Sequence, residues 1–301
     1  MNFTHLAAFY AVARAGSVSA GAAQLHVSQP AVTREIKDLE GRLGLALFDR
    51  LPRGVVLTEA GTLLLTYAEK IFALADTAEI EIKELAGLSR GQLSIGASAT
   101  LGVYLVPDMI ARFNRLFPKV DVALQVINTE QVEAGLVAHQ FALGFIEGPY
   151  DELIFHAEII SNDEIVVVAS AEHPNARRPV HAGSLCAKQV ILREVGSGTR
   201  AAVEKAYQEA GLTITPRMSV NNTEAIKRLV SAQRVLAYLP AASVSGEIAR
   251  GELIVIPVKE FTITRAWRMV WLKGRAFSPS TEAFAKLARS GLIDGHDFPR
   301  T

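Results

Sequence analysis

Apolar and polar positions divide the chain into three stretches with different periodicities. Residues 1–57 form short alanine-rich runs typical of helices: FTHLAAFYAVARAG ends at Gly16, Ser17 is placed to cap VSAGAAQL, and Ser28 to cap QPAVTREIKDLEGRLG. In the last run, apolar residues recur every three or four positions, at Val32, Ile36, Leu39 and Leu43. We therefore expect one face of this helix to join a core and the opposite face to remain free.

The free face of the helix that begins at Ser28 carries polar and basic side chains. Gln29, Thr33 and Lys37 recur every four residues, with Arg34 beside them. Two short helices joined by a tight turn, with such side chains toward the N-terminal half of the second, place them against base edges in a DNA major groove. On spacing alone, a solvated helix face is the competing interpretation.

A two-stranded wing is predicted directly after these helices. LFDRLPRGVVLTEAG has the pattern of a short strand, a Pro/Gly turn with Arg50 and Arg53, and a second short strand. Basic wing tips reach DNA phosphates or a flanking minor groove. The wing therefore favours DNA binding over a merely solvated helix face.

A heptad pattern extends from Thr58 to about residue 89. Thr58 is placed as the N-cap, and apolar residues then repeat at alternating intervals of four and three. A single helix cannot bury such a seam by itself, so we expect it to pair with the same helix of a second subunit; packing against its own domain is the alternative. The predicted dimerisation residues are Leu64, Ala68, Ile71, Ala75, Ala78, Ile82 and Leu85.

Strands and helices alternate from Gly91 to the end of the chain. QLSIGAS, VDVALQVI and FALGFI have strand patterns, separated by helices from Leu101 to Phe117 and from Glu130. The pattern restarts after about residue 160 with EIVVVASA, KQVILRE, PRMSVNN, RVLAYLP and LIVIPV, and ends with AWRMVWLK and a helix. It predicts parallel strands with crossover helices in two half-domains, and ligands usually bind at the junction of such halves.

Composition and charge limit how the chain can bind DNA and which other features it can have. The chain has 301 residues, half of them apolar, and no net charge; residues 1–60 carry +1, from six Lys or Arg and five Asp or Glu. DNA binding there must depend on a few well-placed cations and on doubling by dimerisation. Cys186 is the only cysteine, which excludes an internal disulfide, and we expect it to be a small buried side chain. No apolar run approaches the roughly 18 residues of a membrane helix, so we expect a cytoplasmic protein without membrane contact.

Long stretches of the chain match one known pattern. AAQLHVSQPAVT is followed in a single run by LE, LG, LFDR and LTEAG. This run resembles the DNA-binding module of the LysR-type transcriptional regulators, and LVPDMIARFNRLFPKV, AEHPNA and VLAYLP are similar to that family's effector-binding region. The domains that the resemblance implies are an all-α winged helix-turn-helix N-terminal domain at 1–58, a long linker helix at 59–89, and an α/β periplasmic-binding-protein-like effector domain at 90–301, with subdomains at about 91–161 plus 266–301 and about 162–265.

The resemblance implies a regulator that acts on double-stranded promoter DNA. Its recognition helix begins at Ser28 with the basic wing beside it, and its linker helix pairs two subunits, which assemble further into a dimer of dimers, a homotetramer. RNA polymerase is a further expected partner. The implied DNA-binding residues are Ser28, Gln29, Pro30, Thr33, Arg34, Lys37, Arg50 and Arg53.

The resemblance also implies an effector site in the cleft between the two subdomains. Hydroxyl side chains and helix N-terminal N–H groups at the matching positions suit an anion, although helix capping alone is the alternative for each hydroxyl. The Gly-Ser-Gly-Thr run within REVGSGTR is similar to that of relatives that control carbon dioxide fixation and sulfur assimilation, which suggests a phosphorylated, sulfur-oxyanion or carboxylate metabolite. The implied effector-binding residues are Ser98, Ala99, Thr100, Thr129, Ser197, Gly198 and Thr199, with Asn221 and Asn222 as weaker candidates. The sequence leaves two roles open for the flanking cations: Arg193 and Arg200 either steer the ligand or pair with Glu194 and Glu204.

No catalytic, metal or cofactor site is predicted. Val195 stands where a nucleophile elbow needs glycine, and the chain has neither a P-loop lysine nor a Gly-X-Gly-X-X-Gly. The seven histidines have no metal-like spacing. We therefore expect a sensor and not an enzyme, in which a small anionic effector favours one arrangement of the subdomains and so controls DNA binding or bending. The alternative is a cytoplasmic small-anion-binding protein without promoter-specific regulation.

Overall fold

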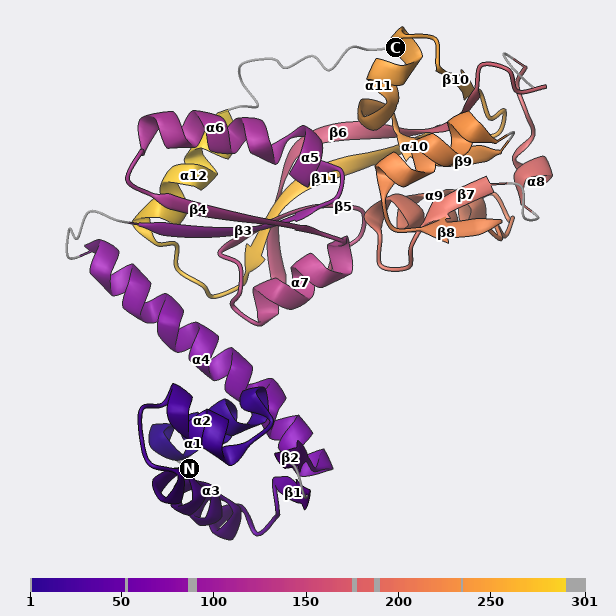
Figure 1. The fold of residues 1–301 in the computed structure, drawn as a ribbon. Helices are drawn as coiled ribbons and strands as arrows, with labels where there is room; N and C mark the ends of the chain where they lie inside the picture. Colours follow the sequence, from indigo (N-terminus) through magenta and orange to yellow (C-terminus); the bar gives the residue numbers. More distant parts are fainter. Residues whose placement is uncertain are drawn as a thin grey trace. The chain divides into compact units, whose positions relative to one another are not determined.

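The computed structural model describes residues 2–51, 54–85, 91–174, 178–186, 190–233 and 235–290. The chain divides into two compact units, Met1–Glu79 and Ile80–Thr301, whose elements are labelled in Figure 1. The boundary falls within one long helix, α4 (Glu59–Leu85).

The first unit consists of three helices, a two-stranded hairpin and the start of α4. Its elements are α1 (Phe3–Ala15), α2 (Val18–Gln24), α3 (Gln29–Leu43), β1 (Phe48–Leu51) and β2 (Gly54–Leu57). The hydroxyls of Ser17, Ser28 and Thr58 each accept a hydrogen bond from the backbone N–H group three residues later, at 3.1, 3.4 and 3.0 Å. α1 ends at Gly16, whose φ of 67° a glycine adopts without strain. The predicted helix starts and the predicted wing are therefore confirmed.

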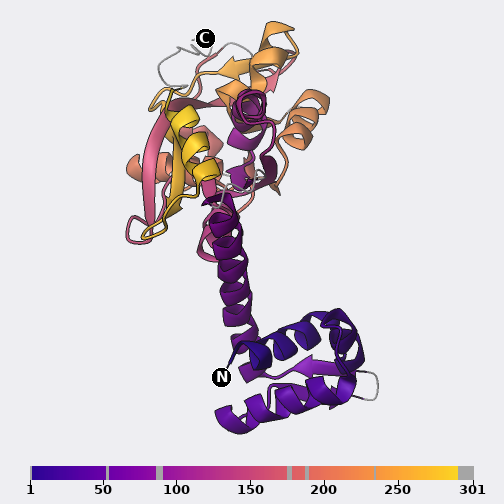
Figure 2. The same ribbon diagram turned by 90° about the vertical axis from the view of Figure 1, so that its left-hand side faces the viewer.

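The core of the first unit joins α1 and α3 to the first turns of α4 (Figure 2). Its buried side chains are Leu6, Phe9, Leu39, Leu47 and Ala68. Tyr10 of α1 stacks on Phe72 of α4, with ring centroids 5.1 Å apart. The start of α4 is thus held by hydrophobic packing as well as by its N-cap.

The apolar face of α3 packs inward as predicted except at its end. Val32, Ile36 and Leu39 are buried. Leu43 is 43% exposed, so its predicted place in the core is wrong. It lies in the final turn, next to Gly44, where a φ of 72° turns the chain out of the helix.

The second unit is an α/β fold with two lobes (Figure 1). Lobe I holds β3 (Gln92–Ser98), α5 (Leu101–Tyr104), α6 (Val106–Leu116), β4 (Asp121–Ile127), α7 (Thr129–Val137), β5 (Leu143–Glu147) and α12 (Pro279–Ser290). Lobe II holds α8 (Ala182–Leu185), β7 (Val190–Arg193), α9 (Gly198–Glu209), β8 (Met218–Val220), α10 (Thr223–Ala232), β9 (Leu236–Pro240), α11 (Ala241–Ala249) and β10 (Leu253–Ile256). Two long strands, β6 (Phe155–Ser170) and β11 (Ile263–Leu272), run through both lobes.

The central strands differ from the predicted parallel arrangement. Within the lobes, β3 pairs in parallel with β4 and β5, and β7 with β8 and β9. β6 and β11 are antiparallel to each other along their length; β11 also pairs with β5, and β6 with β9. One sheet therefore continues from lobe I into lobe II, in the order β4-β3-β5-β11-β6-β9-β7-β8 with β10 on β6.

The helix predicted from Leu101 to Phe117 is broken into α5 and α6. The break is at Leu105, whose φ of −132° is not helical. Pro107, in the first turn of α6, has no N–H group to continue the hydrogen bonds of α5. The result is a short α5 that ends close to the start of a separate helix.

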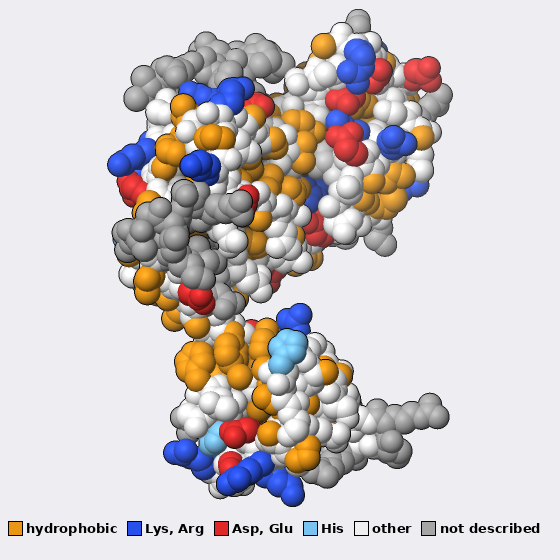
Figure 3. All heavy atoms as spheres, turned by 60° about the vertical axis from the view of Figure 1, so that its left-hand side comes forward, with side chains coloured by type: hydrophobic (Ala, Val, Ile, Leu, Met, Phe, Trp, Pro, Cys, Tyr) orange, Lys and Arg blue, Asp and Glu red, His pale blue; other side chains and the backbone are white. Residues whose placement is uncertain are grey.

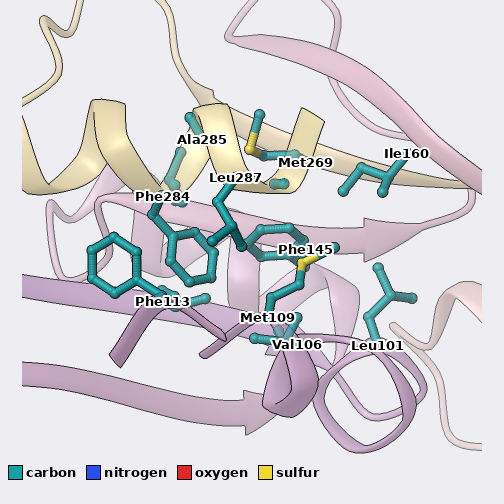
Figure 4. Close-up of a cluster of buried hydrophobic side chains, with 14 of the residues drawn as sticks. Leu101, Val106, Met109, Phe113, Phe145, Ile160, Met269, Phe284, Ala285 and Leu287 are labelled. Atoms are coloured by element: carbon teal, nitrogen blue, oxygen red, sulfur yellow. The ribbon is translucent and has the colours of Figure 1, made fainter. Parts of the chain in front are cut away.

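Separate hydrophobic clusters hold the lobes. In lobe I, Phe284 of α12 packs against Phe113 of α6 and Phe145 of β5, with ring centroids 5.2 and 6.0 Å apart (Figure 4). In lobe II, Tyr207 of α9 and Tyr238 of β9 are buried and share a hydrogen bond of 2.9 Å. Cys186 is half-buried beside this second cluster, less buried than predicted.

Candidate functional site

The predicted DNA-reading face of α3 is open to solvent. On this face Ser28, Gln29, Pro30, Arg34 and Lys37 are exposed and Thr33 is half-buried. Arg34 is loosely held, with 83% of its side chain exposed and a 3.9 Å contact to Asp38. Figure 3 shows Lys and Arg side chains along the lower edge of the first unit, with Asp and Glu among them. Such a face can approach DNA without first breaking strong internal contacts.

The wing is anchored beside α1. The N–H group of Val55 donates to the carbonyl oxygen of Gly16 at 3.0 Å. Gly54 has a φ of 119°, and a Cβ there would lie 2.6 Å from the same oxygen, so glycine is required. Arg50 stands opposite Val55 in the hairpin; Arg53 lies outside the described residues.

The predicted effector residues meet inside the second unit. Ser98, Thr100, Thr129, Ser197, Gly198 and Thr199 are buried, and Ala99 is half-buried. They come from three places: the end of β3, the start of α7 and the start of α9. The sequence did not predict what lies between them.

A carboxylate, that of Glu147, occupies the space between these hydroxyls. It ends β5 and is 2% exposed. The hydroxyl of Ser98 donates to its Oε2, and that of Thr100 to its Oε1 at 3.1 Å. The hydroxyl of Thr129 donates to its backbone carbonyl oxygen at 3.4 Å. Three of the predicted effector-binding hydroxyls are therefore bonded to Glu147 of the chain itself.

Arg265 of β11 joins this carboxylate to lobe II. Its Nη1 lies 2.9 Å from Glu147 Oε1 and donates to Thr199 Oγ1 at 2.9 Å. Its Nη2 lies 2.8 Å from Asp163 Oδ2 and donates to Thr100 Oγ1 at 3.2 Å. We call these six residues the Glu147 cluster: Ser98, Thr100, Glu147, Asp163, Thr199 and Arg265. Both lobes and both long strands contribute to it.

The Glu147 cluster holds two carboxylates against one guanidinium. The side chains of Glu147, Asp163 and Arg265 are 2%, 4% and 2% exposed. Burial raises the pKa of Asp163, although the nearby Arg265 acts in the opposite direction. Each charge depends on its partners, because an unpaired charge at such depth is costly.

The three charged members of the cluster were not identified in the sequence. Glu147 is the last residue of β5, whereas the FALGFI pattern predicts a strand that ends before it. Asp163 and Arg265 are direct cross-strand partners of β6 and β11. A charged residue among alternating apolar positions indicates a solvated strand face, and only the antiparallel register shows that these two face each other in the interior.

A small pocket opens beside the cluster, at the start of α9. Its volume is about 260 Å³, and Thr129, Ser197 and Gly198 line it together with Glu130 and Glu133. Burial raises the pKa of Glu133 to about 7, with the charges of Asp151 and Glu130 adding to the effect. This open space beside the predicted effector residues is thus lined partly by carboxylates.

Gly198 allows the two lobes to touch at this point. A Cβ on Gly198 would lie 2.0 Å from the carbonyl oxygen of Glu147 and 2.9 Å from Thr129 Oγ1. No side chain fits there without moving the backbone of one lobe away from the other. The glycine in this run therefore serves the contact between lobes.

We expect Gly198→Ala to destabilise the second unit by about 1–3 kcal/mol, the usual cost of overpacking a tight contact. Both tryptophans of the chain, Trp267 and Trp271, lie in β11, so urea unfolding followed by tryptophan fluorescence reports on this unit. Gly183→Ala is the matched control, because a Cβ there meets nothing within 4 Å. Equal midpoints for the two variants would show that the close approach at Gly198 has no energetic consequence.

The remaining polar candidates make structural contacts. Arg193 pairs with Glu194 at 2.8 Å, and Arg200 with Glu204 at 2.7 Å, which is the pairing alternative of the sequence analysis. Asn222 caps α10 by accepting from Ala225 N at 2.9 Å. The backbone carbonyl of Asn221 accepts from Arg193 at 3.4 Å.

The predicted dimerisation seam on α4 has two environments. Leu64, Ala68 and Ile71 belong to the core cluster of the first unit, as in the own-domain alternative. Farther along, Ala78 is exposed and Ile82 is 66% exposed. Ala75 is half-buried. The side chain of Leu85 is among those that the structure does not describe. Leu63, Tyr67 and Leu74 are also exposed on this helix, at 61%, 56% and 50%.

The described residues contain neither a group of side chains suited to a metal ion nor a helix suited to a membrane. No three or more His, Cys, Asp or Glu side chains are grouped as a metal ion would require. No helix in the described ranges has the length and apolar character needed to span a membrane.

Comparison with known proteins covers both units. Residues 3–62 match the bacterial regulatory helix-turn-helix protein, lysR family, and residues 86–292 match the LysR substrate binding domain. A RuBisCO operon transcriptional regulator of Allochromatium vinosum is 32% identical over 297 residues, 98% of each chain. Full-length CbnR complexed with its target DNA has a TM-score of 0.70 at 22% identity, over 96% of this chain and 99% of that one. The Synechocystis CcmR regulatory domain in complex with 2-PG has a TM-score of 0.61 at 26% identity, over 67% and 97%.

Proposed function

This chain belongs to the LysR family of bacterial transcriptional regulators, and we propose that a small anionic metabolite controls it by binding at the Glu147 cluster. Family membership makes the chain a DNA-binding regulator with an effector-binding domain, and not an enzyme. In the proposed division of labour, residues 1–58 bind promoter DNA, 59–89 pair subunits, and 90–301 bind the effector. The proposed DNA-binding and effector-binding residues are those that the sequence predicted, with Glu147, Asp163 and Arg265 added to the effector site. For subunit pairing, only the exposed part of the predicted seam, with Ala78 and Ile82, is proposed.

The effector proposal rests on one observation: the hydroxyls of Ser98 and Thr100 and the Arg265 guanidinium converge on a single carboxylate. These donors suit an oxyanion, because a charged acceptor strengthens each hydrogen bond. The relative CcmR binds 2-PG in its regulatory domain. We propose an anion of the same kind for this chain, a phosphorylated, sulfur-oxyanion or carboxylate metabolite.

The Glu147 cluster contacts both lobes, so an anion bound there can change how the lobes are arranged. Thr100 belongs to lobe I and Thr199 to lobe II, and Arg265 bonds to both hydroxyls. A ligand that replaces these bonds changes the relation of the lobes only if it binds one arrangement better than another. We propose that this rearrangement alters how paired subunits hold and bend the operator.

DNA binding and assembly are proposed from the exposed surfaces of the first unit and of α4. α3 offers Gln29, Thr33 and Arg34 to base edges, with Lys37 and the wing arginines nearer the phosphates. The exposed apolar residues of α4, including Ile82, pair it with a second copy in a dimer of dimers. RNA polymerase is the further partner that activation of transcription would require.

We expect Thr199→Val and Thr100→Val to weaken anion binding on the order of tenfold or more, because each removes a hydrogen bond beside a charged group. DNA affinity without the anion should change little, since both residues lie in the second unit. Isothermal titration with 2-PG, sulfate and inorganic phosphate measures the anion affinity. Fluorescence anisotropy of labelled DNA from the promoter of the chain's own gene measures the DNA affinity.

Thr281→Val is the matched control for these variants. Thr281 is also buried and shares a hydrogen bond of 3.0 Å with Ser278, but it lies in α12, away from the cluster. Equal losses of anion affinity in all three variants would show that the cluster is not the effector site. Loss of DNA affinity in step with anion affinity would contradict the division of labour.

A further inference from the structure

The Glu147 cluster cannot hold an added anion in its present arrangement. Its two carboxylates and one guanidinium are each at least nine-tenths buried. A further buried anion would face the two carboxylates of the cluster, whose single guanidinium already pairs with both, and such a charge is costly unless it is paired. If an anion binds here, one carboxylate must leave.

Glu147 is the carboxylate whose donors an anion would use. It accepts hydrogen bonds from the hydroxyls of Ser98 and Thr100 and forms an ion pair with Arg265 Nη1. Asp163, in contrast, bonds to Nη2 and Nε of Arg265, at 2.8 and 3.3 Å. When Glu147 leaves, Asp163 still holds the guanidinium in place.

The backbone of Glu147 makes contacts that do not involve its side chain. Its carbonyl oxygen accepts from Thr129 and packs against Gly198. Gly148 follows with a φ of 92°, and a Cβ there would lie 3.2 Å from the Cα of Gly198. The contact between lobes at this point therefore does not depend on where the carboxylate lies.

We propose that Glu147 is a tethered internal ligand of the effector site: its carboxylate occupies the anion position in the ligand-free chain, and an effector oxyanion displaces it from Ser98, Thr100 and Arg265. This inference rests on the proposed function. It makes Glu147 a specificity-determining residue, because only anions that outcompete a built-in carboxylate occupy the site. It also gives the unliganded state its own bond between the lobes, through Arg265 and Thr199.

The direct test replaces the tethered carboxylate with a free one. Glu147→Ala removes a CH₂–COO⁻ group, and acetate has the matching size and charge. We expect acetate at tens of millimolar to raise the thermal unfolding midpoint of this variant by several degrees, read by tryptophan fluorescence in the full chain. Neutral acetamide should give no such rise.

Glu158→Ala is the matched control, because Glu158 pairs with Arg289 at a partly exposed site. Neither this variant nor the wild type should respond to acetate. An equal response in all three proteins, or none in Glu147→Ala, would overturn the inference.

A second variant leaves no cavity, so its result does not depend on whether the protein tolerates one. Glu147→Gln keeps the size of the side chain but removes its charge, so it is a weaker competitor. We expect it to bind sulfate, inorganic phosphate or 2-PG at least tenfold more tightly than the wild type in isothermal titration. Wild-type affinity or weaker binding in this variant would contradict the inference while leaving the proposed effector site in place. A third outcome separates the two proposals: acetate stabilises Glu147→Ala, but neither the wild type nor Glu147→Gln binds sulfate, inorganic phosphate or 2-PG. That result would support the internal ligand and reject the anionic effector.

Discussion

Arg34→Ala is expected to abolish specific binding to promoter DNA. The Arg34 side chain is 83% exposed on the predicted reading face of α3, and a bidentate arginine contact to a base contributes about 1–3 kcal/mol of discrimination. Two copies act on paired half-sites, so the expected loss is roughly a hundredfold or more in affinity for the specific site. Fluorescence anisotropy with the promoter fragment and with a scrambled fragment of equal length measures this loss.

Arg42→Ala is the matched control for the DNA-binding prediction. Arg42 is an exposed arginine of the same helix, but it lies in the last turn, away from the reading face. Its removal should lower affinity for both fragments alike and by a small factor, since it contributes at most to the general attraction of phosphates. If Arg34→Ala also weakened both fragments equally, Arg34 would contact only the DNA backbone.

Arg265→Met is expected to cause the largest loss of stability in the second unit. It leaves Glu147 and Asp163 buried without their shared cation, and breaking a buried pair in this way costs about 3–5 kcal/mol. Urea unfolding followed by the fluorescence of Trp267 and Trp271 measures the free energy of unfolding of this unit. Protonation of the stranded carboxylates relieves part of the cost, so the loss should shrink as the pH falls.

Arg289→Met is the comparison that shows whether burial is the cause. Arg289 makes a two-bonded contact with Glu158 at 2.8 and 3.1 Å, comparable in distance to those of Arg265. Both partners are more than a third exposed, and such pairs contribute about 0–1 kcal/mol. A loss for Arg265→Met no larger than for Arg289→Met would show that the Glu147 cluster does not support the fold.

Features set by neighbouring residues were predictable from the sequence. Ser17 and Ser28 cap the helices as expected, and Gly16 ends α1, because capping and left-handed turns depend on a few consecutive residues. The alternating strands and helices of the second unit were predictable for the same reason. The resemblance to the LysR family then indicated which hydroxyls would meet.

Features set by distant residues were not predictable in this way. Asp163 and Arg265 oppose each other only because β6 and β11 are antiparallel in one register, and no local pattern contains that register. The heptad pattern of α4 predicts one continuous interface, whereas Ala68 is buried in the core of the first unit and Ile82 is exposed. A heptad pattern shows that a helix face needs a partner but does not identify the partner.

We propose that an anion at the Glu147 cluster controls how the first unit binds DNA. Electrophoretic mobility of the intact chain on the promoter of its own gene, across a titration with 2-PG, tests it with the wild type beside Thr199→Val. We expect 2-PG to change the mobility or the affinity of the wild-type complex. Thr199→Val should bind the same DNA but need at least tenfold more 2-PG for the same change. Identical responses in the two proteins, or a wild-type complex that 2-PG leaves unchanged, would contradict this proposal.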